Sequence, residues 1–124
     1  MSDAMIKLVF VIHAREGLDR AAALHYWREV HAPLVQRLPH LVKYVQKHVA
    51  AGVGGPVPPM LGIGEIWFGT QAEAEVALVS SEMAAVVADG AAFTAQHLAW
   101  RAWVEEHEYP GHGSPVGLDM TIRQ

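Results

Sequence analysis

A histidine, His31, stands in an apolar helical pattern within the stretch LHYWREVHAPLV, residues 24–35. The apolar residues around it, Trp27 and Leu34 among them, recur at helical spacing, and His31 falls on the same stripe. Pro33 cannot donate a backbone hydrogen bond, so we expect the helix to bend or end here and to leave a gap in packing. An imidazole beside such a gap can transfer protons near neutral pH. The alternative is a core histidine hydrogen-bonded to a carbonyl.

Tyr44, Gln46 and His48 form a second group of polar side chains, in the stretch 41–49. This stretch is typical of a β-strand, in which every second side chain points to the same face. If that face meets the helices, the three residues could line the same cavity as His31. If it faces away from the helices, they become polar residues of a dimer core. The sequence leaves both possibilities open.

The remaining chemical patterns favour structural roles. Glu105 and His107 would lie on one face of a strand over residues 102–109, and Glu106 and Glu108 on the other. Two ligands per face are fewer than a metal site needs, so we expect a charged edge strand and no metal. The pair Gly62 and Gly64 predicts a strand kink or bulge instead of a phosphate-binding loop. We therefore expect no cofactor.

The elements that would position these residues follow from periodicity and capping signals. We expect strands over residues 6–13, 41–49, 61–68 and 102–109; helices over 19–32, 33–38 and 70–90, with a pause at 80–81; and a short helix over 93–101. Asp19 is the predicted N-cap of the first helix, and Thr70 with Glu73 forms a capping box for a later one. The order βαββαβ predicts an α+β, ferredoxin-like fold, with a four-stranded antiparallel sheet and helices on one face.

The first predicted strand is apolar on both faces, because Leu8 to Ile12 is an unbroken apolar run. An antiparallel sheet with one solvated face should alternate apolar and polar residues. The helices can cover only one face, and large exposed apolar patches are rare on soluble monomers. The sequence therefore predicts a homodimer that forms through the helix-free face of the sheet.

The whole-chain properties narrow the class of protein. The chain has 124 residues, no cysteine and a net charge of −4. The absence of cysteine excludes disulfides, thiolate metal sites and cysteine nucleophiles. The charge and the lack of a basic cluster argue against nucleic acid and anionic membranes as partners. We expect one domain over residues 1–109, a tail over 110–124, and a cytoplasmic protein.

Four stretches together resemble the EthD family: 6–10, 26–34, 41–49 and 64–68. The Trp-x-x-x-His-x-Pro element, which begins at Trp27, and the Tyr-x-Gln-x-His strand, which begins at Tyr44, carry most of the resemblance. It extends over residues 5–109, and it implies a ferredoxin-like subunit paired into a dimeric α/β barrel. Members of this superfamily include cofactor-free lactone isomerases, polyketide cyclases, monooxygenases and haem-handling enzymes, with a small-molecule pocket between helices and sheet.

The resemblance also implies roles for single residues. His31 matches a helix histidine used in proton transfer, and Tyr44 matches a pocket tyrosine. Ile66 stands near a position where some lactone isomerases have a cysteine, so their mechanism does not transfer whole. We predict a cofactor-free enzyme of isomerase, cyclase/dehydratase or oxidoreductase type that acts on an apolar or aromatic carbonyl compound, with catalytic His31 and Tyr44 and a pocket formed by Trp27, His48 and Ile66. The alternatives are a non-catalytic binding or accessory protein of an ether- or aromatic-degrading redox pathway, and a structural dimer with a filled core.

Overall fold

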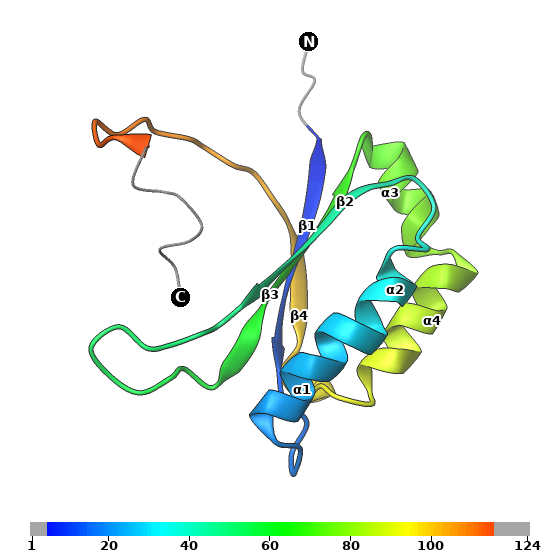
Figure 1. The fold of residues 1–124 in the computed structure, drawn as a ribbon. Helices are drawn as coiled ribbons and strands as arrows, with labels where there is room; N and C mark the ends of the chain where they lie inside the picture. Colours follow the sequence, from blue (N-terminus) through cyan, green and yellow to red (C-terminus); the bar gives the residue numbers. More distant parts are fainter. Residues whose placement is uncertain (1–4, 116–124) are drawn as a thin grey trace.

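The computed structural model of the chain describes residues 5–115. Its four-stranded antiparallel sheet is formed by β1 (Ile6–His13), β2 (Leu41–His48), β3 (Met60–Phe68) and β4 (Trp100–Val104), in the order β2-β3-β1-β4. The helices all lie on one face of the sheet (Figure 1). The predicted α+β, ferredoxin-like architecture is confirmed. Within the described residues, no helix is long and apolar enough to cross a membrane.

The helix starts are defined by side-chain caps. The Asp19 carboxylate accepts a hydrogen bond from the Ala22 N–H at 3.1 Å, at the start of α1 (Arg20–Tyr26). The Thr70 hydroxyl accepts one from the Glu73 N–H, also at 3.1 Å, at the start of α3 (Gln71–Leu78). The predicted pause is present, because Ser80 caps a new helix, α4 (Ser81–Gly90).

Between α1 and α2 (Ala32–Val35) the chain forms a five-residue π-helix, η1 (Trp27–His31). The Ala32 N–H bonds to the carbonyl of Trp27, which is one residue further back than in an α-helix. The next residue, Pro33, has no N–H to continue the α-helical pattern. The predicted disturbance around His31 is therefore a widened turn, and the helix neither ends nor breaks there.

The widened turn keeps the buried side chains of this helical segment in one row. Ala23, Trp27, His31 and Val35 are buried, and each is four positions after the last. Along a regular α-helix, a step of four residues overshoots a full turn by about 40°, so such a row would drift around the helix. The π-turn absorbs part of this drift and keeps His31 facing the sheet.

The last strand differs from its prediction. It begins at Trp100 and ends at Val104. Val104 pairs with Lys7, the second residue of β1, so β1 offers almost no further residues for pairing. The helix expected over residues 93–101 is only the short 3-10 turn η2 (Gln96–Leu98). The acidic stretch 105–108 therefore lies beyond the strand, and its expected placement on an edge strand was wrong.

Two glycines of β3 allow rings to approach the sheet closely. A Cβ atom on Gly64 would lie 2.3 Å from the ring of Phe10. A Cβ atom on Gly62 would lie 2.0 Å from the carbonyl oxygen of Lys47 and 3.0 Å from the ring of Trp27. The predicted irregularity is also present, since the β1–β3 register shifts beside Gly62.

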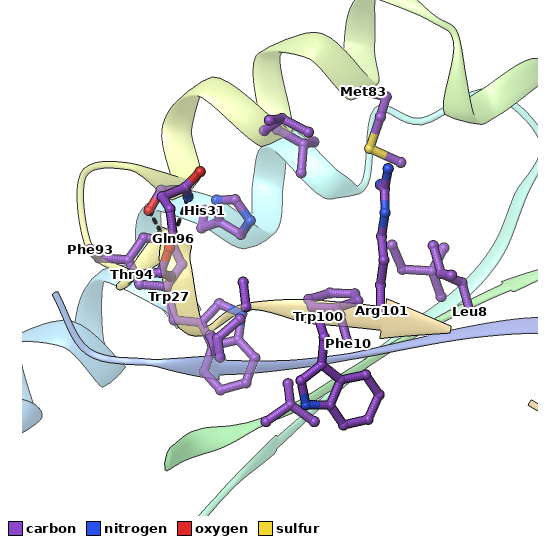
Figure 2. A pocket seen from close by; sticks show the side chains of 17 residues that line it. Leu8, Phe10, Trp27, His31, Met83, Phe93, Thr94, Gln96, Trp100 and Arg101 are labelled. Atoms are coloured by element: carbon purple, nitrogen blue, oxygen red, sulfur yellow. Dashed lines mark hydrogen bonds between the residues drawn. The ribbon is translucent and has the colours of Figure 1, made fainter. Parts of the chain in front are cut away.

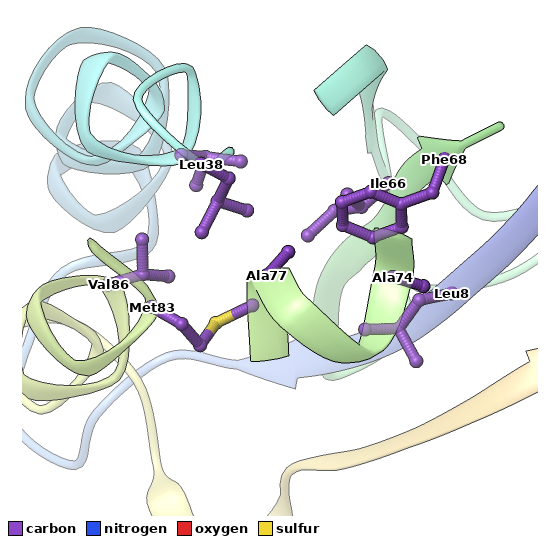
Figure 3. Packing of buried hydrophobic residues seen from close by; sticks show 9 residues of the cluster. Leu8, Leu38, Ile66, Phe68, Ala74, Ala77, Met83 and Val86 are labelled. Carbon is purple, nitrogen blue, oxygen red and sulfur yellow. The ribbon is translucent and has the colours of Figure 1, made fainter. Parts of the chain in front are cut away.

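The helix-covered face of the sheet carries the core. Leu8, Ile66 and Phe68 pack against residues of α3 and α4, among them Ala77 and Met83 (Figure 3). A second cluster surrounds Trp27 at the other end of the helix layer, with Ile12, Leu61 and Phe93. The candidate site described below touches both clusters.

The helix-free face carries a buried charge cluster as well as apolar residues. The carboxylate of Glu65 forms ion pairs with the ammonium groups of Lys7, at 3.3 Å, and of Lys47, at 3.1 Å. Lys7 and Glu65 are only 6% and 7% exposed, and the ring of Trp67 lies between the ammonium groups of Lys7 and Lys43. Burial raises the pKa of Glu65, but hydrogen bonds from both lysines outweigh it and lower that pKa below its ordinary value.

Candidate functional site

A cavity of about 230 Å³ lies between the sheet and the helices (Figure 2). Its walls are mainly apolar and include Leu8, Phe10, Ile66, Met83, Val86 and Phe93. The polar side chains that line it belong to His31, Thr94, Gln96 and Arg101, together with the indole of Trp27. An engineered apolar cavity of about 150 Å³ binds benzene, so this space has room for a substituted ring.

His31 reaches the cavity from the end of the π-turn and is only 4% exposed. Its Nδ1 atom lies 2.8 Å from Oδ2 of Asp89, in the last turn of α4. The other carboxylate oxygen, Oδ1, accepts a hydrogen bond from the Tyr26 hydroxyl at 2.6 Å. The ring of His31 also packs against Phe93, with centroids 4.9 Å apart. His31 is therefore held by a carboxylate, and the expected carbonyl partner is not the one observed.

This arrangement fixes the orientation of the imidazole. A carboxylate at Nδ1 favours the tautomer that has its proton on that nitrogen, which leaves the lone pair on Nε2. Within residues 5–115, Nε2 has no hydrogen-bond partner. The hydrogen bond to Asp89 is also the main reason that the pKa of Tyr26 is raised, with burial adding to it, so the phenol stays a donor.

Tyr44, Gln46 and His48 meet the helices, which resolves the choice between the two faces of β2. The Tyr44 hydroxyl accepts hydrogen bonds from Trp27 Nε1 at 3.1 Å and from Gln46 Nε2 at 2.8 Å. Gln46 also donates to the Trp27 carbonyl at 2.9 Å, and its Oε1 lies 2.7 Å from His48 Nε2. The imidazole of His48 stacks on the Trp27 indole, with centroids 4.7 Å apart.

These β2 side chains contact Trp27 but do not line the cavity. Burial raises the pKa of Tyr44 to about 12, although its hydrogen bonds act in the opposite direction. Burial, with a smaller effect from Arg28, lowers the pKa of His48. Both groups therefore remain neutral near pH 7. The structure thus brings His31, Trp27 and Ile66 together at the cavity and places Tyr44 and His48 outside it.

Sequence reasoning missed Asp89, Tyr26 and Arg101. One signal for Asp89 was available, because a carboxylate in the last turn of a helix is disfavoured by the helix dipole and needs another reason to be there. Tyr26 and Arg101 carried no comparable signal, since their placement depends on the packing of α1 against α4 and on the start of β4. Within residues 5–115, no three His, Asp or Glu side chains are grouped so that they could hold a metal ion.

The EthD domain model matches residues 15–97, which is more than half of the 124-residue chain. The chain belongs to the EthD family. The match includes the π-turn, the β2 residues, Ile66 and Asp89, so most of the candidate site lies within the region that defines the family. The resemblance seen in the sequence is thereby confirmed.

Solved structures with the same fold include two EthD proteins. The EthD family protein from Bacillus halodurans is 21% identical with a TM-score of 0.70, and the match covers 84% of this chain and all of that one. The EthD-like protein from Ralstonia eutropha is 22% identical with a TM-score of 0.57, covering 75% and 84%.

A third solved structure is described as a dimer. This protein of unknown function and ferredoxin-like fold, from Bacteroides fragilis, is 14% identical with a TM-score of 0.55, covering 81% of this chain and 92% of that one. At these identities the solved structures establish the fold alone. No curated protein matches the sequence.

Proposed function

We propose that this EthD-family chain is a small-molecule enzyme that needs no cofactor and uses His31 as a general acid and base. The observation that carries the proposal is the pairing of His31 Nδ1 with Asp89 at 2.8 Å, beside an apolar cavity of about 230 Å³. The ligand class that suits these walls is an apolar or aromatic carbonyl compound. Trp27 and Ile66 would contact its ring.

The proposed step is a proton transfer next to a carbonyl group. The Nε2 lone pair of His31 takes a proton from the carbon beside the carbonyl; the C–H electron pair forms the C=C bond of an enolate, and the π pair of the C=O bond moves onto oxygen. The imidazolium then exchanges this proton with solvent and protonates the same carbon, which is an exchange, or it protonates another carbon of the enolate system, which is an isomerisation. Asp89 offsets the positive charge that the ring carries between the two steps. The step needs no oxidant.

Tyr44 enters this proposal indirectly. Its predicted contact with a substrate carbonyl stays a prediction, because its hydroxyl lies outside the cavity and receives hydrogen bonds from Trp27 and Gln46. We propose that Tyr44 and His48 position the Trp27 indole, which forms part of the cavity wall. In that role they act on the ligand through Trp27.

The test is solvent-deuterium exchange, which requires no knowledge of the physiological substrate. The protein is incubated in D2O with a panel of small lactones, aromatic ketones and cyclic enones, and deuterium at the carbon beside the carbonyl is followed by NMR. We expect exchange with wild type and its loss in His31→Ala. Binding of panel members without exchange by wild type would favour the non-catalytic binding or accessory function.

We also propose that two copies pair through the helix-free face of the sheet. This face carries Val9, Val45 and Ile63 next to the charge cluster around Glu65, and the helices of the same chain cover only the opposite face. Trp100 and Val104 of β4 are 54% and 38% exposed, and a second copy on this face would cover them. The fold similarity to the dimeric Bacteroides fragilis protein supports this pairing.

Sedimentation equilibrium tests the pairing directly. We expect a dimer at micromolar concentration, and a monomer for Val9→Asp, because an unpaired carboxylate would be buried between the sheets. The matched control is Val76→Asp on α3, where the side chain is 51% exposed and the dimer should persist. Circular dichroism shows whether Val9→Asp still folds, and a folded wild-type monomer would contradict the proposal.

A further inference from the structure

Arg101 is the one permanently charged side chain among the residues that line the cavity. It stands on β4 directly opposite Phe10 of β1, and both side chains point to the helix-covered face of the sheet. Figure 2 shows its side chain rising from β4 toward Met83, well apart from His31. The residue is exposed, so its guanidinium lies at the rim of the cavity.

The guanidinium of Arg101 has no carboxylate partner within residues 5–115, although the chain has 13 acidic residues against nine basic ones. Several other cations of the described region are engaged. Lys7 and Lys47 pair with Glu65, and Arg20 donates to three backbone carbonyls. A cation that is left unpaired at the rim of an apolar cavity is free to bind a ligand.

The lining of the cavity contains no carboxylate that would repel an anion. Asp89 lies behind His31, and its two oxygens are occupied by His31 and Tyr26. Arginine binds carboxylates through two parallel hydrogen bonds, and apolar surroundings strengthen the attraction. The rim therefore offers a cation with no competing anion, and the interior offers space for an apolar body.

We propose that the cavity takes an anionic ligand, namely a small aromatic or apolar molecule whose carboxylate binds Arg101 at the rim while its ring lies inside. This inference rests on the proposed function, in that it names the charge of the molecule that occupies the same cavity. Arg101 would then be the specificity-determining residue. It would hold the anionic end at the rim and leave the apolar part to face the His31 end of the cavity.

The test uses pairs of probes that differ in charge and hardly in shape: benzoate and benzamide, cinnamate and cinnamamide, 2-naphthoate and 2-naphthamide. Affinities are measured at pH 8 by calorimetry, with NMR shifts of the lining residues reporting the place of binding. We expect wild type to prefer the acid of a pair by about tenfold, the gain typical of one charge-assisted contact. Arg101→Gln should remove this preference and retain the amide affinity.

Two further variants assign the effect to Arg101. Arg37→Gln removes an equal charge outside the cavity and should leave the preference unchanged. His31→Gln should also leave it unchanged, which excludes the imidazole as the source of the attraction. Equal affinity of wild type for acid and amide would overturn the inference while leaving the proposed function intact. Binding of no probe from any pair would also overturn the inference, whereas the proposed function is decided separately by deuterium exchange with the carbonyl panel.

Discussion

Two histidines near Trp27 differ in what holds them: His31 lines the same cavity as Trp27, and His48 stacks on its indole. His31 is held by the carboxylate of Asp89 at 2.8 Å and borders an open apolar cavity. His48 is held by the amide of Gln46 at 2.7 Å, stacks on Trp27 and borders no such space. The two imidazoles therefore differ both in burial, since His31 is buried and His48 only half-buried, and in their electrostatic partners.

The different partners give the two histidines different abilities to carry a positive charge. A carboxylate can offset the charge of an imidazole that takes up a proton, whereas a neutral amide cannot. Burial lowers the pKa of His48 and nothing nearby opposes it. We infer that the His48 side holds the indole in place and that the His31 side is the one able to move protons.

The largest expected effect is on exchange activity. His31→Ala should lower the deuterium-exchange rate by about 1000-fold, the size of a general acid–base contribution, whereas His48→Ala should change it by less than about tenfold. His25→Ala, on the exposed side of α1, is the matched control. Equal losses in His31→Ala and His48→Ala would show that the two histidines do not differ in the way we infer.

Asp89→Asn tests the partner that distinguishes the two sites. The amide cannot offset charge on the ring, and it can present its NH2 group to Nδ1 and favour the wrong tautomer, so we expect kcat to fall about 100-fold with KM little changed. Glu82→Gln, also on α4 but exposed, serves as control. If kcat in Asp89→Asn matched wild type, the carboxylate would have only a structural role.

Gly62→Ala tests the close approach of Lys47 and the Trp27 indole to β3. Its Cβ would lie 2.0 Å from the Lys47 carbonyl oxygen and 3.0 Å from the Trp27 ring, and the backbone cannot yield cheaply. We expect a loss of about 2 kcal/mol in the free energy of unfolding, measured in urea, as for overpacked cores. Gly55→Ala, which has open space around it, should be neutral. A neutral Gly62→Ala would mean that Trp27 is held loosely.

The smallest effect concerns pH. Because the pKa of His48 is lowered in the folded protein, the unfolded chain binds more protons in the interval just below pH 6.5. Above that pH, the contribution of His48 to the free energy of unfolding is fully present, and it decreases as the pH falls through this interval. NMR titration of the ring protons should give a pKa below 6.5 for His48, and His48→Gln should show a flatter loss of stability. A pKa above 6.5 would contradict this assignment.

Local signals in the sequence were sufficient for most of the fold. The caps at Asp19 and Thr70 depend only on neighbouring residues, and so does the alternation that places Tyr44 and Gln46 on one face. The end of β4 was not predictable in this way, because it depends on where β1 provides a partner.

The candidate site shows the same division. The sequence identified His31 through its spacing and Pro33. The Asp89 partner could not be located, because it lies 58 positions away and reaches His31 only through the packing of α4 against the π-turn. The location of Tyr44 and His48 outside the cavity was equally hidden, since it depends on the Trp27 side chain, which contacts both of them and lines the cavity in their place.

The π-turn at Trp27–His31 also has a consequence for how this helix tolerates insertions and deletions. A widened turn contains one residue more than an α-helix needs, so removing a residue from it can restore a regular helix without breaking the chain. After a deletion between Trp27 and His31, the buried residues Trp27, His31 and Val35 would follow one another at steps of three and four positions, which is the spacing of one face of a regular α-helix. The widened turn therefore absorbs one extra residue: a chain that is one residue shorter here would form a regular α-helix and still present His31 on the same face as Trp27.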